Sequence, residues 1–470
     1  MQKLFQTRLN LKDFNVLSGR SIFEKTNNAM KNIFLLFFLF SVVVVNGQIL
    51  SERDRAKLKD EILEDKFQNL LPQLMDRVEI DLWLIIAREY NEDPVMKTML
   101  PATWLNARRR TMIVFYRNKK QNTLERLAVA RYDIGKSIKS AWQKEKQPDQ
   151  WKALVDIIAE RNPTKIGINV SSHFALADGL VKTDYEALKQ NLPDSLKSRL
   201  VSAEKLAVGW IETRTEMEMK LYDELVKITH SIIDEAYSSK VITPGKTTTD
   251  DVVWWMRQKS TELGLENWFH PTIDVQRAKD EKLKAPEEAF TKKGEGQVIL
   301  KGDMIHCDFG ITYIGLNTDC QQIGYILKDD EKDVPEFLKS AYKKGNRVQD
   351  ILTSNMREGR TGNQILLSSL EQAKAEGLRP AIYTHPLGKY GHSAGPTIGM
   401  WDSQGGVPVR GDYPLYKNTS YAIELNTTVY IEEWQKDIRI MLEEAGFFGG
   451  NDNFRYIVKR QTAIKPIKTN

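Results

Sequence analysis

Five residues that can bind metal ions occur in the C-terminal half of the chain, in the order Asp308, Asp319, His385, Glu424, Glu443. The two aspartates are eleven residues apart in HCDFGITYIGLNTDC, and the others follow in THPLGKYGH, YAIELN and IRIMLEE. Carboxylate oxygens with one imidazole suit Mn, Fe(II), Co or Zn. A fold that brings all five together could hold two divalent ions and activate water at neutral pH. The pattern predicts a metal-dependent hydrolase in which these distant residues converge.

The length of the chain favours two domains, because 470 residues are too many for one ordinary hydrophobic core. A composition of 41% hydrophobic and 28% charged residues is ordinary for a globular protein. Residues 1–47 hold six basic and two acidic residues, which leaves 62 basic and 61 acidic residues in the rest. That near balance argues against nucleic acid as a partner.

The N-terminal region contains a short apolar run that is typical of an export leader. Lys31 precedes the run Ile33–Val45, and small residues suit cleavage near Gly47–Gln48. The run is about thirteen residues long, whereas a membrane-spanning helix needs roughly 20. We expect an exported protein, periplasmic or secreted, with no stable membrane partner after cleavage; an uncleaved anchor is the alternative.

The position of this leader is unusual, because 29 residues precede Met30. A signal peptide normally starts near its own basic region. We therefore expect a signal peptide at residues 30–47 that starts at Met30, and we interpret residues 1–29 as an upstream extension of the reading frame.

The first part of the mature chain has a mixed α/β pattern, and one domain is expected over residues 51–210. It begins with a polar helical stretch at 51–76. Short apolar, β-branched runs and an intervening helical stretch follow. The predicted strands lie at 81–87, 111–117, 126–133 and 165–170, and one predicted helix at 151–160.

A second domain is expected over residues 211–465. It begins with two amphipathic helical patterns, at 214–239 and 243–265, and threonines near the start of the second suit an N-cap. From Trp268 onward, strands and glycine-rich turns are expected, with a charged, solvated loop at 279–297.

The segment around the two aspartates has strand composition on both sides of a central turn. If Asp308 lies opposite Asp319 in a hairpin, Cys307 faces Cys320 on the other side of the sheet, because side chains alternate. The thiols then point away from the metal ligands. They form either a cross-strand disulfide or two buried free thiols. With only two cysteines, the fold does not depend on a disulfide framework.

The individual ligand candidates have ordinary interpretations as well. An isolated pair of aspartates could cap turns, but a buried carboxylate needs a partner, and a cation is one. Glu424 interrupts an otherwise apolar strand pattern, which ligation would explain. Alternation puts Arg439, Met441 and Glu443 on one face and Glu444 on the other, so Glu443 is the preferred ligand and Glu444 the alternative.

Taken together, these motifs resemble the pita-bread-fold metallopeptidases, which include methionine aminopeptidase, aminopeptidase P, prolidase and creatinase. The resemblance covers residues 214–459, and the family uses Asp, Asp, His, Glu, Glu in this order. The seven-residue spacing of His385 and His392 fits the family's metal-binding and proton-transfer histidines. The upstream domain resembles that of the aminopeptidase P, prolidase and creatinase branch. The expected fold class is α/β (α+β), an N-terminal creatinase-like α/β domain followed by a C-terminal pita-bread catalytic domain.

The resemblance implies two bound divalent ions, with manganese expected and zinc, cobalt or iron as alternatives. It implies that Glu424 moves a proton to the leaving nitrogen and that His392 stabilises the tetrahedral intermediate or the substrate amide. A further histidine usually precedes the first aspartate; we assign this role to His270, although His306 is nearer in sequence. The implied ligands are Asp308, Asp319, His385, Glu424 and Glu443.

The implied reaction removes the N-terminal residue from peptides with proline in second position, by attack of a metal-bridged hydroxide. The alternatives are a Xaa-Pro dipeptidase (prolidase), a metal-free creatinase-like hydrolase or a non-catalytic binding protein on the same fold. The expected partners are peptides with a Xaa-Pro N-terminus, and a homodimer is common in the family. Two features depart from the family: "IML" separates Arg439 from Glu443 where one residue is usual, and the charged loop 279–297 interrupts the region before Asp308.

Overall fold

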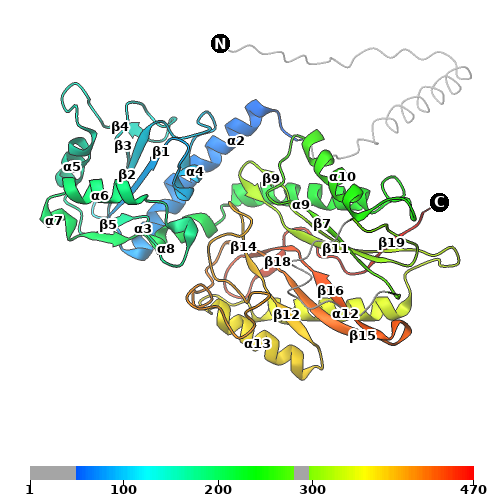
Figure 1. The fold of residues 1–470 in the computed structure, drawn as a ribbon. Coiled ribbons are helices and arrows are strands. Elements are labelled where there is room, and N and C mark those ends of the chain that lie inside the picture. Colours follow the sequence, from blue (N-terminus) through cyan, green and yellow to red (C-terminus); the bar gives the residue numbers. More distant parts are fainter. Residues whose placement is uncertain (1–48, 280–295, 470) are drawn as a thin grey trace, which may run out of the picture. The chain divides into compact units, whose positions relative to one another are not determined.

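The computed structural model describes residues 49–279 and 296–469 (Figure 1). The described residues belong to one compact unit, Ile49–Asn470. The predicted extension and signal peptide lie outside the described residues, as does most of the predicted charged loop. Among the helices of the described part, none has the length and apolar character needed to cross a membrane.

The described chain begins with the helix expected at 51–76. It consists of α2 (Glu52–Asp65), a π-helical turn (Lys66–Leu70) and α3 (Leu71–Val78). Ser51 caps the start, where its hydroxyl accepts a hydrogen bond from the backbone N–H of Asp54.

A six-stranded mixed sheet follows, with strand order β4-β3-β2-β1-β5-β6. The predicted strands correspond to β1, β2, β3 and β5, whereas the sequence pattern predicts no strand at β4 or β6. The strands are β1 Leu82–Arg88, β2 Arg110–Asn118, β3 Thr123–Ala128, β4 Lys139–Ser140, β5 Ile166–Ile168 and β6 Leu200–Ser202.

Both faces of this sheet are covered, which explains why β1 reads as a continuous apolar run. Trp83 and Ile85 pack in a core with residues of α3, α4 and α8, whereas Leu82 and Leu84 pack with residues of α5 and α6 on the other face. The helices are α4 Pro94–Met99, α5 Gln150–Arg161, η2 Ala175–Ala177, α6 Lys182–Asn191, α7 Asp194–Lys197 and α8 Glu204–Glu212. The predicted domain boundary after residue 210 falls inside α8 and stays a prediction.

Two helices open the C-terminal half, as expected: α9 (Glu216–Ala236) and α10 (Thr249–Glu262). Each begins with a capping box, in which a threonine hydroxyl and an acidic side chain three residues later each accept a hydrogen bond from the other residue's N–H. Thr248 is the N-cap of the second helix, which confirms the role expected for the threonines there.

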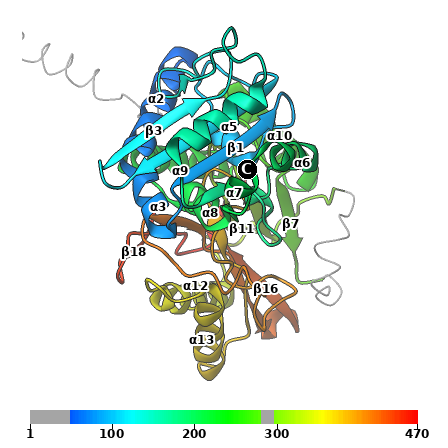
Figure 2. The ribbon, with the colours of Figure 1, turned by 90° about the vertical axis from the view of Figure 1, so that its left-hand side faces the viewer.

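Mostly antiparallel strands then form the rest of the C-terminal half in the expected pita-bread arrangement, with β11 and β19 as a parallel pair. The larger sheets have the orders β19-β11-β8-β7, β12-β15-β16 and β13-β14-β17-β18. Helices α12 (Glu336–Asn355) and α13 (Gly362–Ala375) contact each other and lie side by side in both views (Figures 1 and 2). The remaining elements are β7 Thr272–Gln276, β8 Met304–Phe309, β9 Thr312–Tyr313, β10 Leu316–Asn317, β11 Cys320–Ile326, β12 Pro380–Ile382, β13 His385–Leu387, β14 Thr419–Ala422, β15 Leu425–Ile431, η3 Glu432–Trp434, β16 Lys436–Leu442, β17 Ala445–Phe448, β18 Phe454–Tyr456 and β19 Lys465–Ile467.

The hairpin that carries the two aspartates exists, but its predicted register was wrong. Asp308 pairs with Gln321, not with Asp319, and Cys307 pairs with Gln322, not with Cys320. The reason is the turn, which is centred on Ile314 and Gly315, both with positive φ. A two-residue hairpin turn of this type favours glycine, and the glycine's position sets the register of everything beyond it.

The register error leaves the predicted faces unchanged, because the pairing is shifted by two residues and side chains alternate with the same period. Both cysteines lie on the face opposite Asp308, but they are not directly opposed across the strands. Both are free, buried thiols, so the structure corresponds to the second of the two predicted alternatives.

Candidate metal centre

The five predicted ligands come from the ends of strands that meet at one place. Asp308 lies in β8 and Asp319 directly precedes β11, while His385 is the first residue of β13. Glu424 and Glu443 occupy the short breaks between β14 and β15 and between β16 and β17. Residues 135 positions apart in sequence are thereby brought to one site.

Interatomic distances show that these side chains converge. His385 Nε2 lies 3.5 Å from Glu443 Oε1, 3.6 Å from an oxygen of Asp319 and 3.9 Å from Glu424 Oε2. Asp308, Asp319 and Glu443 offer carboxylate oxygens that all lie within 4.8 Å of one another. The overlapping groups form one cluster of four carboxylates and two imidazoles, the second of which is His392.

This cluster fits a metal by its own chemistry. Four of its buried polar atoms have no hydrogen-bond partner among the described residues: Asp308 Oδ1, Asp319 Oδ1, His385 Nε2 and Glu443 Oε1. Buried polar atoms are normally satisfied, and four neighbouring carboxylates cannot remain ionised together without positive charge. Divalent cations would supply both the missing partners and the missing charge.

The pKa values of these side chains show the same lack of positive charge in the cluster. Burial raises the pKa of Asp308 and of Glu443 well above the usual range, and the neighbouring carboxylates raise both further. Burial also raises the pKa of Glu424 to about 8, although His385 opposes the shift. For His385, burial lowers the pKa, but its interactions with Asp319 and Glu424 outweigh this and raise it overall.

His392 lies at the exposed side of the cluster, where a substrate could reach it. Its ring meets that of His385 edge-on, with centroids 4.7 Å apart, and its other neighbour is Trp268, with centroids 5.4 Å apart. Burial and the charge of His385 lower the pKa of His392. A lowered pKa favours the neutral imidazole, which has one nitrogen able to donate and one able to accept.

Glycines bring the loop that carries His392 close to its supports. Gly388 O accepts hydrogen bonds from both the backbone N–H and the side-chain amide of Asn317, each at 2.9 Å. At Gly391, a Cβ would lie 2.4 Å from the ring of Trp268. Gly391 thus allows the loop to approach Trp268, whose ring packs against His392.

Gln321 is a site residue that the sequence reasoning missed. Its amide Nε2 donates to Glu424 Oε1 at 2.7 Å and to Glu443 Oε2 at 3.0 Å. Its Oε1 lies 2.8 Å from His306 Nε2, and because an amide oxygen only accepts, the imidazole donates. The available signal was alternation, since Gln321 is two residues after Asp319 on the same strand face.

The structure does not bring His270 to the cluster. Its side chain is exposed, lies edge-on to Trp254 and has Nδ1 3.4 Å from an Arg257 nitrogen. It belongs to none of the groups of potential ligands among the described residues. The physical reason is that residue 270 precedes β7, whereas His306 lies within β8, on the same strand face as Asp308. A catalytic role for His270 remains only a prediction.

Glu444 turns away from the cluster, as alternation predicted. Both of its carboxylate oxygens lie 2.9 Å from His230 Nε2, and Gln322 Nε2 donates to Oε1 at 3.3 Å. Cys320 Sγ lies 4.0 Å from both partners, behind the ligand face. The geometry thus favours Glu443 over Glu444 as the ligand.

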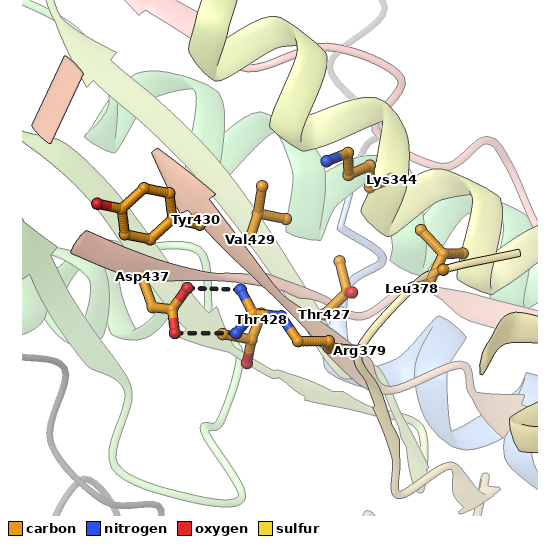
Figure 3. Close-up of a pocket in the computed structure, with 9 residues that line it drawn as sticks. Lys344, Leu378, Arg379, Thr427, Thr428, Val429, Tyr430 and Asp437 are labelled. Atoms are coloured by element: carbon orange, nitrogen blue, oxygen red, sulfur yellow. Dashed lines mark hydrogen bonds and ion pairs between the residues drawn. The ribbon is translucent and has the colours of Figure 1, made fainter. Parts of the chain in front are cut away.

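A separate hollow of about 410 Å³ lies along β15, between α12 and β16, and contains none of the five residues (Figure 3). Its charged residues include Arg379 and Asp437, which form a two-point ion pair with one contact of 2.9 Å. This hollow therefore offers no counterpart to the carboxylate cluster.

Comparison with known proteins relates the C-terminal half of the chain to a metallopeptidase family. Residues 220–444 match the model of metallopeptidase family M24. No match was found among curated proteins.

The matches to solved structures with the same fold extend over almost the whole length of those structures. The X-Pro aminopeptidase of Thermotoga maritima is 16% identical, with a TM-score of 0.58, and the match covers 84% of this chain and 99% of that one. The Xaa-Pro dipeptidase of Bacillus anthracis is 16% identical, with a TM-score of 0.55 and coverages of 87% and 99%. The prolidase of Pyrococcus furiosus is 16% identical, with a TM-score of 0.51 and coverages of 83% and 99%. At these identities the likeness establishes the fold.

Proposed function

We propose that this protein is an aminopeptidase specific for Xaa-Pro N-termini, because residues 220–444 match the model of metallopeptidase family M24 and the chain has the fold of X-Pro aminopeptidases and prolidases. The enzyme would release the first residue of peptides that carry proline in second position. We further propose that it is exported, periplasmic or secreted, and that it acts as a homodimer.

The observation that carries this proposal is the convergence of Asp308, Asp319, His385, Glu424 and Glu443 around buried atoms that lack partners. Oxygen-rich donors with one imidazole suit two hard or borderline divalent ions, and manganese is our proposed metal. Bound there, such ions supply Lewis acidity and lower the pKa of water. A metal-free hydrolase or a binding protein would leave the charge of this cluster uncompensated.

The remaining residues around the cluster suit the proton transfers of peptide cleavage. Proline nitrogen is a poor leaving group until it is protonated, so a nearby acid is required. We assign the delivery of that proton to Glu424, whose carboxylate accepts a hydrogen bond from the amide of Gln321. We assign to His392, at the accessible side, the role of holding the substrate amide or the developing negative charge.

A prolidase, restricted to dipeptides, is the second candidate. Its support is that prolidases and Xaa-Pro dipeptidases are among the solved structures with this fold. The two activities differ in the length of peptide that the site accepts.

Hydrolysis of Xaa-Pro peptides of two lengths, a dipeptide and a longer peptide, tests the proposal. We expect the manganese-loaded protein to cleave the longer peptide after its first residue, and Asp308→Ala to abolish cleavage. Asp330→Ala, which removes an exposed carboxylate outside the cluster, serves as the matched control. Cleavage of the dipeptide alone would establish the prolidase instead, and full activity of Asp308→Ala would refute both.

A further inference from the structure

A cavity of about 650 Å³ lies in the N-terminal half and shares no residue with the metal centre. It is lined by residues 103–110 and 130–132, together with Glu89, Trp142 and Gln150. This volume lies within the range of pockets that hold small ligands or a few residues of a peptide. Catalysis, as proposed above, makes no use of it.

The cavity carries an excess of positive charge. Four arginines line it, and Glu89 is the single acidic residue among its lining residues. Arg110 is already paired, with Nε 3.2 Å from the Asp184 carboxylate. Among the residues that the structure describes, no carboxylate forms an ion pair with the guanidinium of Arg108, Arg109 or Arg131, and all three side chains are exposed. Exposed guanidinium groups that form no ion pair are suited to bind the carboxylates of a ligand by two parallel hydrogen bonds.

The hollow along β15 provides a useful contrast. There, Arg379 is bound by Asp437, so its guanidinium is occupied (Figure 3). Arg108, in contrast, lies over aromatic rings, 4.9 Å from the centroid of Trp104 and 5.8 Å from that of Tyr132. Ring contacts of this kind orient a guanidinium but leave its N–H groups free for a ligand.

Apolar side chains lie exposed beside these arginines. Leu105 is 85% exposed and Tyr132 is 54% exposed, and both line the cavity. Tyrosine, tryptophan and arginine are the residues that contribute most to binding at protein–peptide contacts. Exposed apolar residues that surround a cavity are typical of a binding surface.

The rim of the cavity is fixed before any ligand binds. Arg109 has a φ of 52°, which is uncommon for a residue with a side chain. Two hydrogen bonds hold it there: its N–H donates to Glu89 Oε2 at 3.2 Å, and its carbonyl accepts from the Glu89 N–H at 2.7 Å. A preformed rim reduces the entropy that binding would otherwise cost.

From these observations we propose that this arginine–aromatic pocket binds an acidic peptide segment. Carboxylates of the segment pair with Arg108, Arg109 and Arg131, and an apolar side chain packs against Leu105 and Tyr132. A nucleic acid is the less favoured occupant, because the chain beyond residue 47 is nearly neutral and phosphate backbones need an extended basic surface.

Fluorescence polarisation with a short labelled peptide of alternating glutamate and leucine tests the proposal on the full-length protein. We expect saturable binding that weakens about tenfold or more in Arg131→Gln and in Arg109→Gln, because each removes one charge-assisted contact. Arg53→Gln, an exposed arginine on α2, is the matched control and should bind as the wild type does. Tyr132→Ala should also weaken binding.

Three outcomes would overturn the proposal. The first is equal binding of a peptide in which glutamine replaces every glutamate, which would show that binding does not depend on the negative charge of the peptide. The second is unchanged affinity of both arginine variants, with thermal melts like that of the wild type. The third is tighter binding of a single-stranded oligonucleotide of the same net charge.

Discussion

At the scale of single residues, Gln321 links both glutamates of the cluster to His306. One amide nitrogen reaches Glu424 and Glu443, so the two carboxylates are oriented by the same side chain. Groups that orient metal ligands commonly contribute 10- to 100-fold to metal affinity or activity.

We therefore expect Gln321→Ala to lower manganese affinity and kcat by roughly 10- to 100-fold. We also expect the free energy of unfolding to fall by about 1–3 kcal/mol, because buried partners of Gln321 lose a hydrogen bond. Titration of metal into the apoprotein and steady-state kinetics measure the effects on metal affinity and kcat. Gln322→Ala, the next residue on the opposite strand face, should retain the metal affinity. Wild-type affinity in Gln321→Ala would contradict the orienting role.

Glu212 is a second residue with a measurable effect, on stability. It is buried, its Oε2 has no hydrogen-bond partner among the described residues, and burial raises its pKa to about 8 despite the nearby Arg77. A raised carboxyl pKa means that the folded state keeps a proton that the unfolded state loses. Its contribution to stability therefore falls as pH rises from about 4.5 to about 8.

We expect Glu212→Gln to be more stable than the wild type above pH 8 by a few kcal/mol, and to lose the advantage near pH 5. The magnitude follows because each tenfold difference in proton affinity between the folded and unfolded states corresponds to about 1.4 kcal/mol. Urea unfolding at both pH values measures the difference. Glu186→Gln, at an exposed position on α6, should show no such pH-dependent gain. An equal effect of the two substitutions would contradict the assignment.

At the scale of elements, the loop between β13 and β14 positions His392, and Gly391 is its critical contact. Alanine at Gly391 would place its Cβ 2.4 Å from the Trp268 ring, which itself packs against His392. We expect Gly391→Ala to lower kcat at least tenfold and to cost about 1–3 kcal/mol of stability, while metal content is retained.

Steady-state kinetics with metal analysis checks this expectation, and Gly405→Ala is the matched control because its Cβ would meet no atom within 4 Å. Should Gly391→Ala show wild-type kcat, the close contact with Trp268 would have no part in positioning His392.

The elements also show what could be predicted from sequence. The strand face of the ligands and the choice of Glu443 followed from alternation alone, because the side-chain period is fixed by the backbone. The register did not follow, since it depends on whether the turn is centred on Gly315 or one residue earlier. His270 could not be placed either, because its position depends on tertiary packing of β7 and α10 that periodicity does not describe.

At the scale of the whole molecule, a buried charge cluster joins the N-terminal helix to the catalytic half. Glu218 on α9 lies 3.6 Å from Lys66 Nζ, 2.9 Å from Lys389 Nζ and 3.4 Å from Arg214. Burial alone would raise the pKa of Glu218, but the charges of Arg214, Lys389 and Lys66 outweigh it and lower the pKa. Lys389 belongs to the loop of His392, so this cluster connects that loop to α9 and to the helix before β1.

We expect Glu218→Gln to destabilise the protein by about 3–5 kcal/mol, because it leaves the buried Lys66 and Arg214 and the partly buried Lys389 without their carboxylate. Glu224→Gln, which breaks an exposed pair with Lys227 on the same helix, should cost less than about 1 kcal/mol. Denaturant unfolding compares them, and equal costs would show that the buried cluster does not hold the parts together.

The central claim, that the five convergent residues bind metal, is tested most directly by counting manganese ions bound per chain at equilibrium. We predict about two ions in the wild type and in Glu444→Gln, and fewer in Asp308→Ala and Glu443→Gln. A wild-type protein that binds no ion, or a Glu443→Gln variant that keeps full occupancy while Glu444→Gln loses it, would contradict the account.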